Sequence, residues 1–392
     1  MPTTDDMSVN DRRMYLKQMK KRYVTATRAE RGGLLTEMEQ VTGLHRKSLT
    51  RLLHAGSLER QPRLRQRTRS YGLDVEQVIV RVWESRDYIC AERLTPGLLK
   101  MAQHLASFEP LGLTSPVQEQ LATISRATVA RILRKHRSRV RRLPQKGAER
   151  ANAATKGVPM GRLPWDLAEP GHFEVDLVYH SGESTQGLHG HTIQLIDVAT
   201  GWSERTAVLG RGQRAMEGGF EHILQRVPFA IKELHPDNGS EFFNQHLVRY
   251  WKDKVTGVQL SRSRPYQKND NRLVEQKNAT LVRQYLGDLR LDTPEQMAAL
   301  NALYEQMWLY YNLFQPVLHL CEKTLTGDKV VRKWDQAQTP YERLVTSGVL
   351  SHEQQAHLQQ LYEQTNPRQL RQAIYRQLEA LWQSATQPGN VA

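Results

Sequence analysis

The sequence predicts a mixed α/β domain at residues 165–320, preceded by two all-α regions and followed by a helical C-terminal region. Three observations favour this class. From Gly171 onward, short apolar runs alternate with helical patterns, which is typical of a sheet covered by helices. Residues 12–140 instead show the three- and four-residue apolar spacing of helices. Hydrophobic residues make up 39% of the 392, enough for a packed core.

Positive charge is concentrated in the N-terminal part of the chain. Residues 1–150 hold 30 Lys and Arg against 15 Asp and Glu, a net charge of +15, whereas the remainder holds 25 and 26, a net charge of −1. This asymmetry is typical of a nucleic-acid-binding arm. Cys90 and Cys321 are the two cysteines, so a disulfide framework and a zinc-ligand cluster are excluded. No run approaches about 18 apolar residues, so we expect no membrane span and a cytoplasmic location.

The first helical domain is expected at residues 12–59, after a tail at residues 1–11. The pattern is helical from Arg12 to Gln40, and Gly43 then supplies a turn before a short helix. This is the sequence form of a helix-turn-helix whose second helix enters the major groove of DNA. The residues expected to contact DNA from this helix are Arg46, Lys47 and Arg51. An ordinary helical hairpin with a solvated basic face is the alternative.

A second unit of this kind is expected at residues 74–140, after a basic linker at residues 60–73. Ser125 is suited to cap its last helix, which then presents Arg126 and Arg131 to DNA. Two tandem units would lengthen the DNA site and raise specificity. A second basic linker, residues 141–164, leads into the α/β domain.

The α/β domain is expected to contain a five-stranded sheet, because three neighbouring strands are followed by two more that alternate with helices. The expected strands are His172–His180, Thr192–Val198, Trp202–Leu209, Ile231–Leu234 and Val258–Leu260. The expected helices are Met216–Arg226, Glu241–Lys252, Asp270–Leu286 and Thr293–Asn312. Residues 321–392 are expected to be a helical region, with amphipathic helices at Glu353–Gln364 and Pro367–Ser384.

Three carboxylates are the candidate catalytic and metal-binding residues. Asp176 lies within an apolar strand pattern, where a charge is unfavourable unless it is paired or bound to metal. Asp237 follows the fourth strand in an Asp-Asn-Gly turn, and Glu275 begins a helical pattern. We expect the three to meet and to hold two divalent metal ions for phosphodiester chemistry, Mg²⁺ with Mn²⁺ as a substitute. Asp270 and Glu241 are rivals for the third position.

The segments that contain these carboxylates resemble the catalytic domain of retroviral-integrase-like transposases, the DDE group of bacterial insertion sequences and retroviruses. The matching segments read FEVDLVYH, TIQLIDVATGW, HPDNGSEF and SRPYQKNDNRLVEQKN. The 37 residues between Asp237 and Glu275 are close to the spacing of that group. The resemblance implies a ribonuclease-H-like fold.

The resemblance also implies a reaction. Asp176 would bridge two metal ions, with Asp237 and Glu275 completing one site each. The family reaction is hydrolysis at a transposon end, followed by attack of the freed 3′-hydroxyl on target DNA. The partner would be double-stranded DNA, namely the transposon ends and the target. The protein would act as a homo-oligomer on this DNA, and its helical domains would bind the terminal inverted repeats.

The sequence departs from the retroviral pattern in two respects. No His/Cys zinc-binding unit precedes the α/β domain. Ala279 and Val282 occupy positions where retroviral members carry DNA-contacting lysines, so Lys268, Lys277 and Arg283 are the expected substitutes. Two other functions stay open at this stage. One is a DNA-binding repressor or domesticated transposase that does not cut, and the other is a ribonuclease-H-like nuclease without strand transfer.

Overall fold

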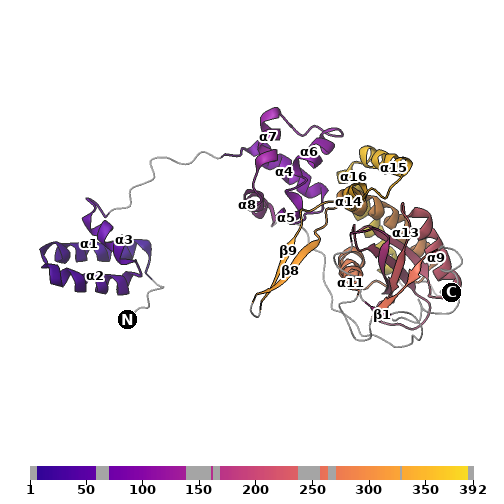
Figure 1. Cartoon of the computed structure of the whole chain (residues 1–392), viewed down its shortest axis with the longest axis horizontal. Coiled ribbons are helices and arrows are strands. Elements are labelled where there is room, and N and C mark those ends of the chain that lie inside the picture. Colours follow the sequence, from indigo (N-terminus) through magenta and orange to yellow (C-terminus); the bar gives the residue numbers. More distant parts are fainter. Residues whose placement is uncertain are drawn as a thin grey trace. The chain divides into compact units, whose positions relative to one another are not determined.

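The computed structural model describes residues 7–58, 70–137, 160–161, 168–236, 257–263, 271–326 and 329–386. The chain divides into two compact units, residues 1–70 and residues 71–392 (Figure 1), and each is described by itself. Within the described ranges, no helix is long and apolar enough to cross a membrane.

The first unit is a three-helix bundle with its own small core. Its helices are α1 (Val9–Thr25), α2 (Arg28–Thr42) and α3 (Arg46–His54). The pattern expected as helical from Arg12 to Gln40 is divided in two, because Thr27 and Glu30 form a capping box that starts a new helix. Gly43 ends α2 in the left-handed conformation, with φ 68°, which glycine adopts without steric strain. The buried apolar residues are Leu16, Met19, Tyr23, Leu35, Met38, Leu49 and Leu53.

The second helical region belongs to the same compact unit as the sheet. Its helices are α4 (Leu73–Ser85), α5 (Ala91–Leu94), α6 (Leu98–Ala106), α7 (Ser115–Thr123) and α8 (Arg126–His136). Polar contacts join it to later parts of the chain. Arg93 Nε donates to the Pro316 carbonyl at 2.6 Å, and the Tyr310 hydroxyl donates to the Ser85 carbonyl at 2.7 Å. These helices therefore pack on the α/β domain.

The central sheet has five strands in the order β4-β3-β2-β5-β6. They are β2 (His172–His180), β3 (Gly190–Asp197), β4 (Ser203–Leu209), β5 (Glu233–Pro236) and β6 (Gln259–Leu260). β2, β3 and β4 are antiparallel neighbours, whereas β5 runs parallel to both β2 and β6. This mixed five-stranded sheet with helices fits the expected ribonuclease-H-like core. β2 is the middle strand, so its side chains lie within the sheet and not at its edge.

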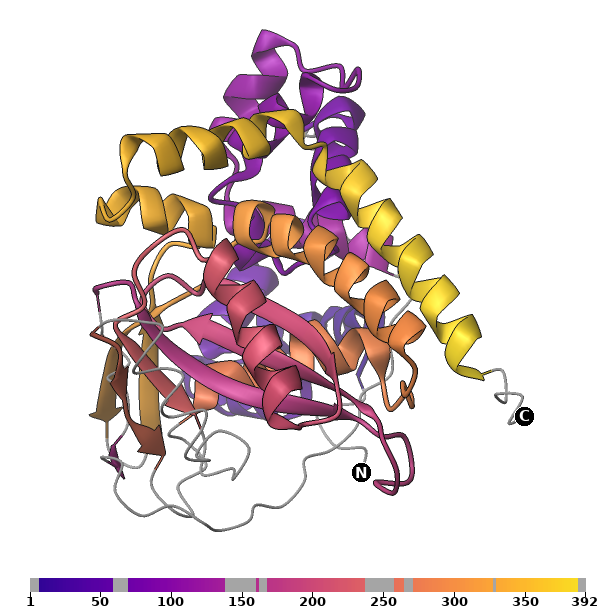
Figure 2. The same ribbon diagram turned by 90° about the vertical axis from the view of Figure 1, so that its right-hand side faces the viewer.

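Helices cover the sheet. On one face α9 (Gln213–Arg226) approaches so closely that a Cβ at Gly219 would lie 2.7 Å from Ile193 Cδ1 and 2.8 Å from Val208 Cγ1. On the other side lie α11 (Arg272–Lys277), the π-helix η2 (Asn278–Arg283), α12 (Gln284–Leu286), α13 (Pro294–Leu309) and the π-helix η3 (Tyr310–Phe314). The last helix, α16 (Pro367–Thr386), runs along α13 (Figure 2).

Two expected elements differ from the structure. The helix expected over Asp270–Leu286 is described from Arg272 and is interrupted by η2, in which each hydrogen-bonded turn contains one extra residue. The region expected to be helical from residue 321 begins instead with a β-hairpin, β8 (Leu320–Thr326) and β9 (Lys329–Trp334), because Val330, Val331 and Trp334 favour a strand.

The remaining elements follow the hairpin or lie apart from the central sheet. α14 (Pro340–Ser347) and α15 (His352–Gln364) precede α16, and the amphipathic helices expected near residues 353–364 and 367–384 are thereby confirmed. β1 (Met160–Gly161) pairs with β7 (Arg262–Ser263) in a small parallel sheet. The helix expected at Glu241–Lys252 lies outside the described residues.

Candidate active site

Asp176 lies at the centre of the middle strand and is held by two donors. Its Oδ1 accepts a hydrogen bond from the Leu177 N–H at 2.8 Å, and its Oδ2 accepts one from the Asn278 side-chain amide at 2.5 Å. The strand register places Asp176 opposite Gln194 on β3, and Gln194 opposite Arg205 on β4. The carboxylate therefore lies in a row of polar residues that crosses β2, β3 and β4.

Glu174, two residues earlier on β2, attaches the candidate catalytic helix to the sheet. It is only 2% exposed, and its Oε2 accepts hydrogen bonds from the backbone N–H groups of Leu273 (2.7 Å) and Val274 (2.9 Å). A carboxylate is stabilised at this position because the first N–H groups of a helix have no partner within the helix. Glu174 therefore caps α11 from the neighbouring strand.

Glu275 lies on α11, within the first turn after the Glu174 cap. Its side chain is exposed, and Asn278 follows it three residues later. Residues at this spacing are neighbours on one helix face. Because Asn278 donates to Asp176, the helix face that carries Glu275 is turned toward the strand that carries Asp176. The meeting of the two carboxylates themselves stays a prediction.

Asp237 and Lys268 lie outside the described residues, so their positions in the site stay predictions. Pro236, the residue before Asp237, ends β5 and pairs with Val175, the residue before Asp176. Within the described part of the chain, no group of three or more His, Cys, Asp or Glu side chains could hold a metal ion.

The oxygen donors next to Asp176 suit a hard divalent cation. Asn278 Oδ1 is buried, and among the described residues it has no hydrogen-bond partner. It belongs to the same amide group that donates to Asp176. Carboxylate and amide oxygens are ligands that Mg²⁺ accepts, and Mg²⁺ keeps several waters when few protein ligands are present. Asp176, Glu275 and Asn278 therefore fit such an ion in chemical type.

Arg205 supports the π-helix that follows Glu275. Its side chain is buried, and Nη1 donates to the Leu281 carbonyl at 3.4 Å. The guanidinium lies 5.6 Å from the ring centroid of Tyr304 and 5.3 Å from that of Tyr311. Burial lowers its pKa, but the group stays charged because an arginine begins with a very high pKa. The residue is a permanent cation beneath η2.

Lys277 is half-buried near other cations. Burial, together with the positive charges of Arg93 and Arg205, lowers the pKa of Lys277 to about 7. Its charge therefore changes with pH close to neutrality. This environment could not be predicted from local sequence, because Arg93 and Arg205 come from α5 and β4, far away in the chain.

The DNA-contacting residues expected in the first unit lie on α3. Lys47 and Arg51 are exposed. Arg46 also fixes α3 to α2, because its Nη1 donates to Thr36 Oγ1 and its Nη2 donates to the Gly32 carbonyl, both at 3.1 Å. Lys47 and Arg51 therefore have the greater freedom to contact a ligand.

The corresponding residues of the second helical region lie on α8. The side chain of Ser125 caps this helix by accepting a hydrogen bond from the Thr128 N–H, as its sequence predicted. Arg126 and Arg131 are exposed. Arg126 Nη1 lies 3.3 Å from Glu92 Oε1 in an exposed ion pair, which is a weak interaction and can be exchanged for another anion.

Comparisons with known proteins place the chain in a family but give it no activity. No protein-family profile matches it. The catalytic core domain of BIV integrase aligns over 45% of this chain and 95% of its own chain, with 17% sequence identity and a TM-score of 0.29. We draw no conclusion from a TM-score of this size. The uncharacterized protein y4rM of Sinorhizobium fredii is 36% identical over 323 residues, which cover 82% of this chain and 91% of y4rM. At that identity and coverage, the chain belongs to the same protein family as y4rM.

Proposed function

We propose that this protein is a DNA transposase. It binds the terminal inverted repeats of a mobile element, hydrolyses the phosphodiester bonds at the 3′ ends and transfers the freed 3′-hydroxyl groups to target DNA. The observation that carries the proposal is the attachment of α11 to β2. Glu174 caps the helix and Asn278 binds Asp176, so the two described candidate carboxylates are on elements that are fixed to each other.

In the proposed mechanism, Asp176, Asp237 and Glu275 hold two divalent metal ions, Mg²⁺ or Mn²⁺. When bound, these ions supply a nucleophilic water or hydroxyl and offset the charge that develops on the phosphate. The other residues hold the ligands in place. Asn278 orients Oδ2 of Asp176, and Arg205 supports the π-turn after Glu275.

DNA is delivered to this site by the basic N-terminal part of the chain. Residues 1–150 carry a net charge of +15, whereas the remainder carries −1. Long-range attraction for phosphates therefore comes from the helical regions, and exposed Lys47, Arg51 and Arg131 are the residues we assign to it. Lys277 and Lys268 are assigned to the DNA end near the carboxylates. We expect a homo-oligomer on DNA, since two ends are processed together.

The test uses linear DNA that ends in the inverted repeats flanking the gene, a plasmid target and Mg²⁺ or Mn²⁺. Wild-type protein should nick the 3′ ends and join them to the plasmid. Asp176→Asn, Asp237→Asn and Glu275→Gln should each lose both activities while still binding the ends. Asp288→Asn is the matched control, because Asp288 is an exposed carboxylate just after the same helical segment and is expected to retain activity.

Each result of this test separates one function from another. End joining by the Asp237→Asn variant would show that the metal assignment is wrong. Nicking by the wild type without joining would favour a nuclease, and binding without nicking would favour a repressor. Substituting Lys47 and Arg51 by Ala should weaken end binding and leave Mn²⁺ affinity intact.

A further inference from the structure

The hairpin β8–β9 is an exposed ribbon that no other strand accompanies among the described residues. It forms a separate two-stranded sheet and projects away from the central sheet (Figure 1). Val331 is 50% exposed and Trp334 is 51% exposed, which is unusual for large apolar side chains on one short strand. An isolated two-stranded hairpin is marginally stable in water. Exposed apolar side chains on such a hairpin are typical of a surface that binds a partner.

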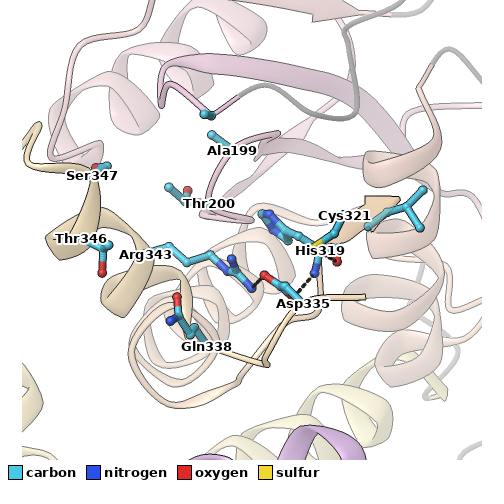
Figure 3. Close-up of a pocket in the computed structure, with 11 residues that line it drawn as sticks. Ala199, Thr200, His319, Cys321, Asp335, Gln338, Arg343, Thr346 and Ser347 are labelled. Carbon is cyan, nitrogen blue, oxygen red and sulfur yellow. Dashed lines mark hydrogen bonds and ion pairs between the residues drawn. The ribbon is translucent and has the colours of Figure 1, made fainter. Parts of the chain in front are cut away.

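The base of the hairpin is firmly anchored, in contrast to the ribbon itself. The His319 N–H donates to Asp335 Oδ1 at 2.8 Å, and the Asp335 N–H donates to the His319 carbonyl at 2.9 Å. Arg343 on α14 forms an ion pair with Asp335 at 2.7 Å (Figure 3). These residues line a pocket of about 370 Å³ that also includes Thr200. The ribbon therefore extends from a fixed support.

The charges of the ribbon identify the partner as an anion. Residues 320–334 contain four basic and two acidic residues, Lys323, Lys329, Arg332, Lys333, Glu322 and Asp328. Arg332 and Lys333 are exposed on β9. The Lys333–Glu322 ion pair, with its atoms 3.9 Å apart and both side chains exposed, contributes little. The surplus of basic over acidic residues therefore favours a polyanion as the partner.

We propose that the β8–β9 hairpin is a DNA-binding ribbon that lies in a groove of duplex DNA. A two-stranded ribbon fits the major groove, which is about 12 Å wide. Arg332 and Lys333 contact phosphates, and Val331 and Trp334 provide apolar contact beside them. A second copy of the chain is a less suitable occupant, since pairing two such ribbons would bring their basic residues together. The proposal rests on the proposed function, in which duplex DNA is the partner.

The first experiment measures how the affinity of the full chain for a short duplex of arbitrary sequence depends on salt, with EDTA present so that no cleavage occurs. Replacing Arg332 and Lys333 by Ala should lower the slope of log affinity against log salt by about 2, because each phosphate contact adds roughly 0.9. The matched control replaces Arg211 and Arg214, an exposed basic pair at the start of α9, and should keep the slope. A slope that is unchanged, or that falls equally in the control, overturns the proposal.

The second experiment uses the two cysteines and does not alter the ribbon's charge. Cys321 lies exposed on β8, and Cys90 is exposed before α5. In the Cys90→Ser variant, a photoactivatable aryl azide attached to Cys321 should crosslink to the duplex. The Cys321→Ser variant, labelled at Cys90, measures the background crosslinking to DNA from an exposed label outside the ribbon. A Cys321 label that crosslinks two protein chains and not DNA overturns the proposal in favour of a second copy.

These readouts are independent of catalysis. If wild-type protein fails to nick or join DNA ends but Cys321 crosslinks to DNA, the proposed function fails and the ribbon proposal stands. If the ends are joined but the ribbon variants bind as the wild type does, the ribbon proposal fails alone.

Discussion

The attachment of α11 by Glu174 gives the sharpest prediction, and the perturbation is Glu174→Ala. The two backbone N–H groups that it caps, at 2.7 Å and 2.9 Å, would be left without their acceptor at a site that is 2% exposed in the wild type. A hydrogen bond to a charged group contributes about 1.5–3 kcal/mol, and an anion at a helix N-terminus adds roughly 0.3–1 kcal/mol. We therefore expect the opening free energy of α11 to fall by about 3–7 kcal/mol.

Amide hydrogen exchange at Leu273 and Val274 measures this change directly. A fall of about 3 kcal/mol corresponds to exchange faster by about two orders of magnitude. End cleavage should fall as well, by roughly 10²-fold, because a displacement of about 1 Å in a catalytic group has an effect of that size. Glu174→Gln keeps one acceptor oxygen without the charge, so its exchange and cleavage should be intermediate.

The control for this prediction is Glu169→Gln. Glu169 precedes the same strand and pairs with Lys232 at the surface, so the substitution should change neither exchange nor cleavage. The reasoning is refuted if Glu174→Ala leaves the exchange at residues 273–274 and the cleavage rate at wild-type values. That result would mean that other contacts hold α11 on the sheet.

Two further predictions concern stability. Asp87 accepts hydrogen bonds from Arg371 Nε, the Tyr285 hydroxyl and the Tyr375 hydroxyl at 2.7–3.0 Å. Asp87→Ala should therefore weaken the attachment of α4–α8 to the α/β domain by about 3 kcal/mol, measured as faster limited proteolysis of α4–α8. An unchanged digestion pattern would contradict this prediction. Burial lowers the pKa of His180 from 6.5 to about 3, so the unfolded state binds more protons between these values and stability is lost as pH falls through them. His180→Gln should therefore reduce the slope of unfolding free energy against pH by up to about 1.4 kcal/mol per unit, measured by urea unfolding at several pH values, and an equal slope would show that His180 does not contribute.

Much of the α/β domain could be predicted because its elements have strong local signals. Alternating apolar residues identified His172–His180 as a strand, and the observed β2 has the same bounds. Turn residues such as Gly201 separated the next two strands correctly. The interruption of the helix after Lys277 was not predicted, and one of its contacts comes from far away in the chain, since Arg205 on β4 donates to the Leu281 carbonyl.

The candidate site was predicted from residue type and spacing, and its arrangement could not be obtained that way. Asp176 and Glu275 were identified by motif and spacing, and the structure puts them on elements joined by Asn278. The role of Glu174 was missed. The signal was a second carboxylate two residues before Asp176, on the same face of an apolar strand, where burial requires a partner. Asp237 stays a prediction.

The sequence by itself determined the five strands of the central sheet, most helices, the charge asymmetry and the choice of candidate carboxylates, because these depend on local pattern and composition. Only the tertiary structure decided that β2 is the middle strand, that Glu174 caps α11, that Lys277 lies beside Arg93 and Arg205, and that the β8–β9 ribbon is exposed. Each of these depends on contacts between residues far apart in the chain, and the burial and charge that such contacts impose cannot be obtained from neighbours in the sequence.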